Sequence, residues 1–135
     1  MIQLKTIDHI VLRVTDIERA IAFWRDVLGC PLERELPDMG LYQMRAGDCL
    51  IDLVPVTSKL GQVGGAAPGA DGHNMDHVCL RVENWDAAAI TAHLKSHGID
   101  VPDSGRRYGA DGFGPSIYIR DPDGNTVELK GPPEP

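Results

Sequence analysis

The sequence predicts an α+β fold made of two tandem βαβββ modules. Residues 7–14, IDHIVLRV, return as residues 75–82, MDHVCLRV, with aspartate, histidine, leucine, arginine and valine in the same register. Each copy is an apolar run of strand length, and a helical pattern that ends in glycine follows it. Further short apolar stretches come after each helix, so one structural unit is written twice along a chain of 135 residues.

The helix of the first module is predicted over residues 17–28. Apolar side chains recur there at helical spacing, and Gly29 follows as the C-terminal stop. Thr15, with Glu18 three residues later, has the form of a capping box, so we expect Thr15 to be the N-cap. Strands are then expected at residues 32–36, 41–45 and 49–54, with a tight turn at residues 46–48.

The second module repeats this order. A helix is expected at residues 85–97, with Asn84 as its N-cap and Gly98 as its stop. The sequence DPDG at residues 121–124 is typical of a tight turn and predicts a hairpin between the last two strands. The strands of this module are expected at residues 99–102, 116–120 and 125–130.

Composition favours one compact domain that binds a small molecule. The hydrophobic content of 42% is enough to fill a core, with module one at about residues 4–56 and module two at about 75–131. Residues 57–74 between them are rich in glycine, which predicts a mobile surface loop, an inter-module linker or a lid over the active site. The net charge of -7, spread along the chain, disfavours nucleic acids and anionic membranes as partners.

The chain shows no signal of export. It has no signal-peptide pattern and no apolar stretch near the roughly 18 residues that a membrane span needs. Its three cysteines form no CxxC pair and lie in apolar runs, as free thiols do in a reducing compartment. A cytoplasmic location is therefore expected.

Two histidines and two carboxylates occupy matching positions in the two modules. His9 and His77 lie on the first strands, whereas Asp52 and Glu128 lie between branched aliphatic residues on the last strands. Because side chains alternate along a strand, each carboxylate points away from its apolar neighbours, toward solvent or a polar cavity. One such residue alone is usually structural or solvated. A repeated pair is better explained by a pseudo-twofold arrangement that gathers all four side chains on one concave surface.

These four side chains form a mixed nitrogen and oxygen donor set. Two imidazoles with one or two carboxylates leave coordination positions open for water and substrate. Such a set suits Fe(II), Mn(II), Ni(II), Co(II) or Zn(II). The sequence therefore predicts a metal-dependent enzyme.

The chain resembles the vicinal oxygen chelate superfamily, which includes glyoxalase I, fosfomycin-resistance thiol transferases, extradiol dioxygenases and bleomycin-binding proteins. The resemblance extends from about residue 4 to residue 130. It is carried by DHIVLRV at 8–14, AFWRDVLG at 22–29, DHV at 76–78 and DPDGNTVEL at 121–129. It implies the glyoxalase/bleomycin resistance/dioxygenase fold.

The resemblance also implies a metal site. By it, His9, His77 and Glu128 are ligands, and Asp52 stands where glyoxalase I-like members carry a fourth ligand. It implies a homodimer with shared sites, each drawing His9 and Asp52 from one chain and His77 and Glu128 from the other.

The leading function that the resemblance implies is a glyoxalase I-like isomerisation or lyase step. The metal binds vicinal oxygens of the substrate, Glu128 moves a proton at the adjacent carbon, and Asp52 is the second catalytic candidate. Arg13 matches a position that contacts a carboxylate of glutathione in glyoxalase I-like proteins. Glutathione is therefore a candidate cosubstrate.

Other activities of the superfamily are alternatives. Ser116 and Tyr118 match a Ser-x-Tyr run of fosfomycin-type thiol transferases, although those enzymes carry a threonine where this chain has Val11. Extradiol-type ring cleavage is a second alternative, with Tyr118 as acid or hydrogen-bond donor. Arg107, in the glycine-rich stretch before the hairpin, is a further candidate for substrate binding. A drug-binding resistance protein without metal is the alternative outside the enzymes.

Overall fold

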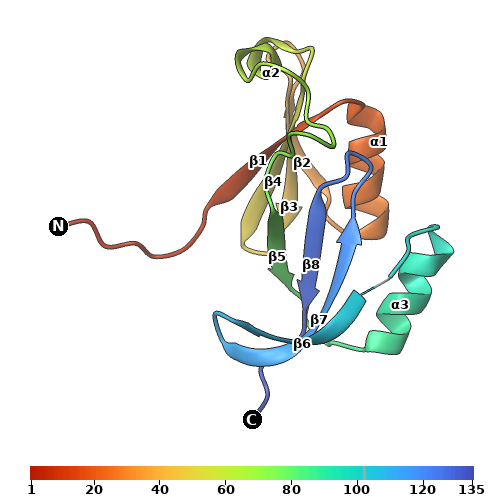
Figure 1. Ribbon diagram of the computed structural model, residues 1–135. Helices are drawn as coiled ribbons and strands as arrows, with labels where there is room; N and C mark the ends of the chain where they lie inside the picture. Colours follow the sequence, from red (N-terminus) through yellow and green to blue (C-terminus); the bar gives the residue numbers. More distant parts are fainter. Residues whose placement is uncertain (102) are drawn as a thin grey trace. The chain divides into compact units, whose positions relative to one another are not determined.

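The computed structural model describes residues 1–101 and 103–135, which divide into two compact units, Met1–Asn74 and Met75–Pro135 (Figure 1). Each unit contains one mixed four-stranded sheet. The strand order is β1-β4-β3-β2 in the first sheet and β5-β8-β7-β6 in the second. Because the two orders are equivalent, the predicted α+β fold of two tandem βαβββ modules is confirmed.

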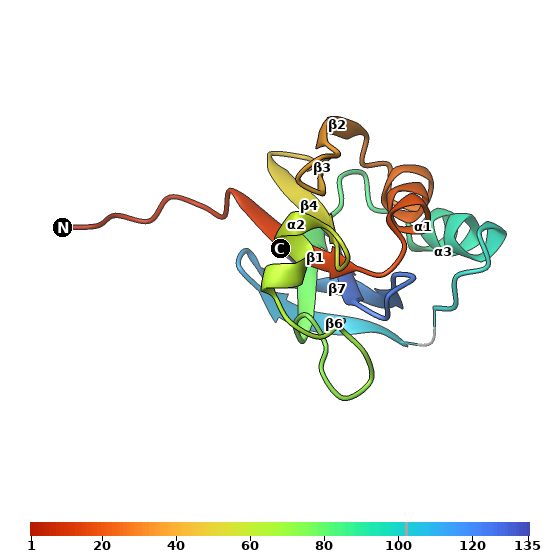
Figure 2. The ribbon, with the colours of Figure 1, turned by 90° about the horizontal axis from the view of Figure 1, so that it is seen from above.

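In the first unit, the first and last strands of the sheet lie side by side. β1 is an edge strand parallel to β4, and β3 is antiparallel to both of its neighbours. The residues before β1 leave the sheet as an extended segment (Figure 2). The elements are β1 (His9–Val14), α1 (Ile17–Ala22), η1 (Phe23–Val27), β2 (Leu32–Leu36), β3 (Leu41–Ala46), β4 (Cys49–Pro55) and α2 (Lys59–Val63).

The first helix begins one residue later than the capping-box prediction requires. Asp16, and not Thr15, is the N-cap, because its extended backbone brings its carboxylate to the backbone N–H of Arg19 at 3.1 Å. α1 continues into the π-helical turn η1, whose Trp24 is completely buried. Gly29 follows with a φ of +70°, which confirms it as the stop.

The second unit repeats the pairing of the first. β5 is parallel to β8, and β7 is antiparallel to β6 and β8, so the predicted β7–β8 hairpin is confirmed. The elements are β5 (His77–Arg81), α3 (Ala87–Ser96), β6 (Asp103–Gly109), β7 (Gly112–Arg120) and β8 (Thr126–Lys130).

Two local predictions for this unit are wrong. The N-cap of α3 is Asp86, whose carboxylate accepts from the N–H of Ala89 at 3.0 Å, and not Asn84. Residues 99–101 form no strand, and Pro102 of the predicted strand lies outside the described residues. The strand is instead β6, which has no apolar alternation and is held by continuous pairing with β7.

The glycine-rich segment after β4 is not all loop. It contains α2, whose N-cap Ser58 accepts from the N–H of Gly61 at 3.0 Å. Gly61 is buried against the main chain at Pro55, where a Cβ atom would clash with the carbonyl oxygen. No helix in the two described stretches is both long enough and apolar enough to cross a bilayer.

The turn between β7 and β8 is built around the buried carboxylate of Asp121. Its Oδ1 accepts from the backbone N–H groups of Asp123 at 3.0 Å and Asn125 at 2.8 Å. Its Oδ2 accepts from Nδ2 of Asn125 at 2.8 Å. This network fixes the entry into β8, two residues before Glu128.

Substitution of Asp121 tests this role. We expect Asp121→Ala to lower the free energy of unfolding by about 2 kcal/mol or more, because it leaves buried N–H donors without an acceptor. Urea denaturation measures the change. Asp48→Ala is the matched control: Asp48 is an exposed residue of the equivalent turn in the first unit, and we expect a change within about 0.5 kcal/mol. Equal losses in the two variants would contradict this role of Asp121.

Candidate metal and substrate site

The first half-site consists of His9 and Asp52, on the adjacent parallel strands β1 and β4. Val11 is in register with Asp52, and His9 lies two residues before Val11 on the same face of the sheet. Asp52 is only 3% exposed, whereas Val11 is 51% exposed. On this face, the edge strand β1 is therefore open to solvent, whereas the carboxylate on β4 is shielded from it.

Asp8 orients the imidazole of His9. The Nδ1–Oδ1 distance is 2.6 Å, and because a carboxylate only accepts, Nδ1 carries the proton. Nε2 is then the nitrogen that remains for a ligand. The hydrogen bond to Asp8 and the charge of Asp52 raise the pKa of His9, against a smaller opposing effect of burial. Protons therefore compete with a metal ion for this nitrogen.

The second half-site consists of His77 and Glu128, on the adjacent parallel strands β5 and β8. Nε2 of His77 lies 3.3 Å from Oε2 of Glu128. Asp76 holds Nδ1 of His77 at 2.6 Å, as Asp8 does for His9. Glu128 is 6% exposed and is in register with Cys79, the counterpart of Val11. Both units thus present an imidazole and a shielded carboxylate on adjacent parallel strands.

The geometry of the second half-site fits metal ligation. Two atoms each about 2.1 Å from one ion, at angles between about 90° and 109°, lie about 3.0 to 3.4 Å apart. The pair His77 and Glu128 falls within this range. A carboxylate on the other imidazole nitrogen is also the usual support of a metal-binding histidine.

Neither unit alone holds a complete ligand set. Over residues 1–101 and 103–135, no three side chains of the histidine, cysteine, aspartate and glutamate types form a cluster that could hold an ion. Each unit supplies one histidine and one carboxylate.

Three predicted substrate-binding residues lie together beside Glu128. Tyr118 is in register with Glu128, and its ring lies edge-on to that of His77 with centroids 5.5 Å apart. The guanidinium of Arg107 lies 4.4 Å from the centre of the Tyr118 ring, and its Nη1 donates to Oγ of Ser116 at 2.7 Å. Burial, the charge of Glu128 and a hydrogen bond to it raise the pKa of Tyr118, so the phenol is a donor.

Sequence reasoning missed Lys130 in this group. Lys130 follows Glu128 on the same face of β8 and is 7% exposed. Its Nζ donates to the carbonyl of Arg107 at 2.5 Å and, more weakly, to that of Gly114 at 3.4 Å. Gly109 leaves room for it, because a Cβ atom there would lie 2.6 Å from Cε of the lysine. A lysine at the end of a strand is usually solvated. The one feature of the sequence that could have indicated the burial of Lys130 is the glycine at position 109.

Sequence reasoning also missed Gln43, which faces Asp52 across the β3–β4 pair. Its Nε2 donates to both carboxylate oxygens of Asp52, at 3.2 and 3.3 Å. The register explains the omission, because the predicted turn at residues 46–48 would set residue 43 opposite residue 51, whereas the observed pairing of Ala46 with Cys49 sets it opposite Asp52. Gln43 in the first unit therefore occupies the position that Tyr118 occupies in the second.

Arg13 lies on the same face of β1 as His9, further along the strand. Its Nη2 and Nη1 donate to the carbonyls of Gly65 at 2.6 Å and Ala66 at 3.0 Å. Nδ2 of Asn74 donates to the backbone carbonyl of Arg13 at 2.8 Å. Arg13 thus holds the middle and the end of the glycine-rich segment along β1, while its predicted contact with a substrate carboxylate stays a prediction.

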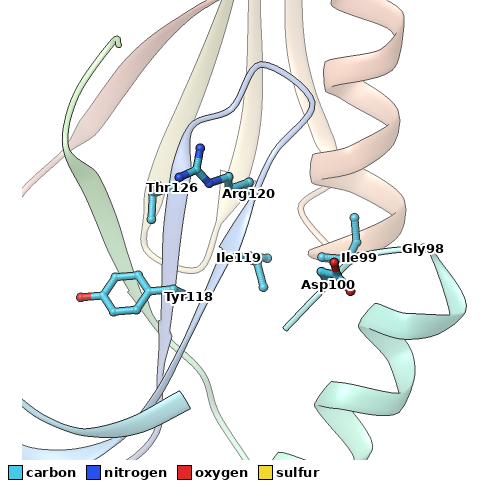
Figure 3. A pocket seen from close by; sticks show the side chains of 7 residues that line it. All are labelled: Gly98, Ile99, Asp100, Tyr118, Ile119, Arg120 and Thr126. Carbon is cyan, nitrogen blue, oxygen red and sulfur yellow. The ribbon is translucent and has the colours of Figure 1, made fainter. Parts of the chain in front are cut away.

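A cavity of about 500 Å³ borders β7 on the side of the segment that follows α3. Tyr118 lines it and is in register with Glu128, whereas neither His77 nor Glu128 lines it. Figure 3 shows the phenol of Tyr118 turned away from Ile119, as alternation along β7 requires. The lining residues are Gly98, Ile99, Asp100, Tyr118, Ile119, Arg120 and Thr126.

Comparison with known proteins decides the family. A model of the Glyoxalase/Bleomycin resistance protein/Dioxygenase superfamily matches residues 6–129, almost the whole chain. The chain belongs to this superfamily. The match includes both half-sites and the DPDG turn between β7 and β8.

Curated members of the superfamily resemble this chain at modest identity. The mitochondrial methylmalonyl-CoA epimerase of Mus musculus is 28% identical over 134 residues, which cover 95% of this chain and 74% of the relative. The glutathione transferase FosA of Serratia marcescens is 25% identical over 126 residues, with coverages of 93% and 80%. The crystal structure of lactoylglutathione lyase from Agrobacterium tumefaciens matches with a TM-score of 0.70 at 24% identity, covering 96% and 95% of the two chains, and shares the fold.

The reactivity of Cys79 reports on Glu128. Partial burial of the thiol, the charge of Glu128 and a hydrogen bond to it raise the pKa of Cys79 to about 11. In protein treated with a chelator, we expect iodoacetamide to alkylate Cys79 slowly at pH 8.5, with about a tenfold gain per pH unit, because the thiolate is the nucleophile. Glu128→Gln removes the charge and should speed this reaction several-fold.

Peptide mass spectrometry measures the alkylation of each cysteine separately. Cys49 in the same sample is the internal control, because it lies in the other unit and its rate should not respond to Glu128→Gln. A Cys79 rate that is the same in both proteins would contradict the contact with Glu128.

Proposed function

We propose that this protein is a metal-dependent isomerase of glyoxalase type. In this reaction a proton leaves the carbon next to two oxygens of the substrate and is returned to a neighbouring position. The observation that carries the proposal is the convergence of Nε2 of His77 and Oε2 of Glu128 at 3.3 Å. Its support is the equivalent pair, His9 and Asp52, in the first unit.

In this proposal His9, His77 and Glu128 hold a divalent ion of Ni, Zn, Mn, Fe or Co, with Asp52 as the fourth candidate ligand. When bound, such an ion binds the vicinal oxygens of the substrate and stabilises negative charge on them. We propose a homodimer in which one chain contributes His9 and Asp52 to a site and its partner contributes the other two groups. The closed symmetry of a dimer then produces two equivalent sites.

The proton-transfer groups in this proposal are Glu128 and Asp52. Both carboxylates are nearly excluded from solvent, which strengthens their interaction with charge that develops on the substrate. Tyr118, as a hydrogen-bond donor, holds Glu128 in place. In the isomerisation one carboxylate takes the proton from carbon and, as the carboxylic acid, returns it to the neighbouring carbon, so the enzyme ends the cycle unchanged. Where the second group, as an acid, returns a proton instead, exchange with solvent restores both groups.

In this proposal, positively charged side chains around the half-sites bind the substrate. Arg107 and Ser116 form a hydrogen-bonded pair beside Tyr118, which suits a carboxylate or phosphonate group of the substrate. Arg13 is proposed to bind a carboxylate of a cosubstrate such as glutathione. A carboxylate would replace the carbonyls of Gly65 and Ala66 with stronger, charge-assisted bonds.

The similarity to methylmalonyl-CoA epimerase supports proton transfer as the shared chemistry. An epimerisation next to a carbonyl and a glyoxalase-type isomerisation begin alike, with removal of a proton from the adjacent carbon. They differ in where the proton is returned. Two carboxylates on separate strands provide both the group that removes the proton and the group that returns it.

Thiol transfer of the fosfomycin type is the second candidate. The cluster of Arg107, Ser116 and Tyr118 favours it, because it places one cation and two hydroxyl groups beside Glu128. The similarity to the glutathione transferase FosA supports it as well. The exposed Val11 speaks against it, because an apolar side chain in register with Asp52 offers no hydroxyl group to a substrate.

Metal content tests the first part of the proposal. We expect protein purified without chelators to carry about one divalent ion per chain, because the proposed homodimer has two equivalent sites. His77→Ala should lose most of this metal. His93→Ala is the matched control, because His93 is an exposed histidine of α3 next to His97 and its loss should leave the content unchanged.

Inductively coupled plasma mass spectrometry measures the bound metal in each variant. Wild-type protein that stays free of metal after reconstitution with Mn, Fe, Co, Ni and Zn would contradict the enzyme proposal. It would favour a metal-free drug-binding protein instead.

Turnover tests the reaction class. We expect metal-loaded protein to isomerise the adduct of methylglyoxal and glutathione or to epimerise methylmalonyl-CoA. Glu128→Gln with its metal content restored should lower kcat by about 100-fold or more, because it removes a proton-transfer group. Spectrophotometric and NMR assays measure these products. Product formed only from fosfomycin and glutathione would favour thiol transfer, and ring cleavage of a catechol would favour the dioxygenase.

A further inference from the structure

The carboxylate of Asp52 has an unusual hydrogen-bond partner for a buried acid. One amide nitrogen, Nε2 of Gln43, donates to both of its oxygens, at 3.2 and 3.3 Å. Because Asp52 is only 3% exposed, water contributes few hydrogen bonds to its carboxylate. A neutral amide therefore supplies the hydrogen bonds that the buried carboxylate needs.

The orientation of the Gln43 amide is fixed by a third residue. An amide has a donor end and an acceptor end, and only one of its two orientations presents the donor to Asp52. Nη1 of Arg34, on β2, donates to Oε1 of Gln43 at 3.1 Å. Because a guanidinium only donates, this contact sets the acceptor end toward β2 and the donor end toward β4.

The three residues form a ladder across neighbouring strands. Arg34 pairs with Gln43 across β2 and β3, and Gln43 pairs with Asp52 across β3 and β4. The same row continues to Val11 on β1, next to His9. The exposed charge of Arg34 thus acts on a shielded carboxylate through the dipole of one amide group.

We propose that Gln43, oriented by Arg34, is the positioning residue of Asp52. It holds both carboxylate oxygens and so fixes the direction in which Asp52 faces the metal ion or the substrate. The inference rests on the proposed function, because that function gives Asp52 its role. Without the amide, Asp52 is a buried carboxylate that must turn toward other donors.

Titration with Co(II) of the full chain, freed of metal by a chelator, tests the inference without any substrate. We expect Gln43→Leu to weaken Co(II) binding by about tenfold or more, the usual effect of losing an outer partner of a metal site. The visible absorption of bound Co(II) should change as well, because the carboxylate takes a different direction. Arg34→Leu should change both readouts in the same direction by a smaller factor.

A double-mutant cycle shows whether Gln43 acts through Asp52. In an Asp52→Asn background, we expect Gln43→Leu to leave Co(II) affinity nearly unchanged, because the group that it positions is gone. Gln62→Leu is the matched control. The amide of Gln62, in the same unit, donates to the carbonyl of Thr57 at 2.8 Å, and its loss should leave Co(II) binding unchanged. Thermal unfolding confirms that each variant is folded.

The outcomes separate the two proposals. Wild-type protein that binds Co(II) no better than Gln43→Leu overturns the positioning role and leaves the proposed metal site standing. An equal loss from Gln43→Leu in the wild-type and Asp52→Asn backgrounds also overturns it. Wild-type protein that binds no Co(II) overturns the proposed function and this inference with it. If Gln43→Leu does not fold, Gln43→Glu keeps the size and the bond to Arg34, and its repulsion of Asp52 must alter Co(II) binding.

Discussion

The parallel pairing of the first and last strands in each unit is the constraint on which both half-sites depend. β1 lies beside β4, and β5 lies beside β8, although a helix and two strands separate the members of each pair along the chain. A parallel pair needs such a crossover, and the βαβββ order supplies it. The consequence is that a histidine near the start of one strand and a carboxylate in the middle of the other become neighbours on one face. The chemistry of the site is therefore a result of topology before it is a result of any single side chain.

Each buried carboxylate then needs its own support, and the two units solve this problem differently. Asp52 is held by the amide of Gln43, with Arg34 behind it, whereas Glu128 has the phenol of Tyr118 and the thiol of Cys79. The positions are equivalent, because Gln43 and Tyr118 both face the acid from the middle antiparallel strand. The fold thus repeats the positions but not the side chains.

The sequence predicted the fold, but not the residues that surround the four candidate ligands. The repeated IDHIVLRV pattern and the DPDG turn predicted the modules and the hairpin, because both depend on local sequence. β6 was missed, since its polar and glycine-rich residues become a strand only through pairing with β7. The caps at Asp16 and Asp86 were missed by one and two residues, because several polar residues near a helix start compete for the same role. Lys130 looked like an exposed strand end, because the room for its side chain beside Gly109 arises only when β6 pairs with β7.

The two half-sites differ in the contacts of their carboxylates, and this difference gives the two acids unequal freedom of movement. Nε2 of His77 already lies within ligand spacing of Glu128, so an ion bound to that histidine has Glu128 as its nearest acid. Asp52 is one methylene shorter than a glutamate, and Gln43 engages both of its oxygens from the side of β3. A short carboxylate whose two oxygens both accept hydrogen bonds from Gln43 has less freedom to move onto an ion than a longer carboxylate. Such a carboxylate keeps the direction that Gln43 gives it, toward an ion or toward a substrate. The repeated module thus carries, within a single chain, one carboxylate whose direction is fixed by an amide and one that lies beside a histidine at ligand spacing.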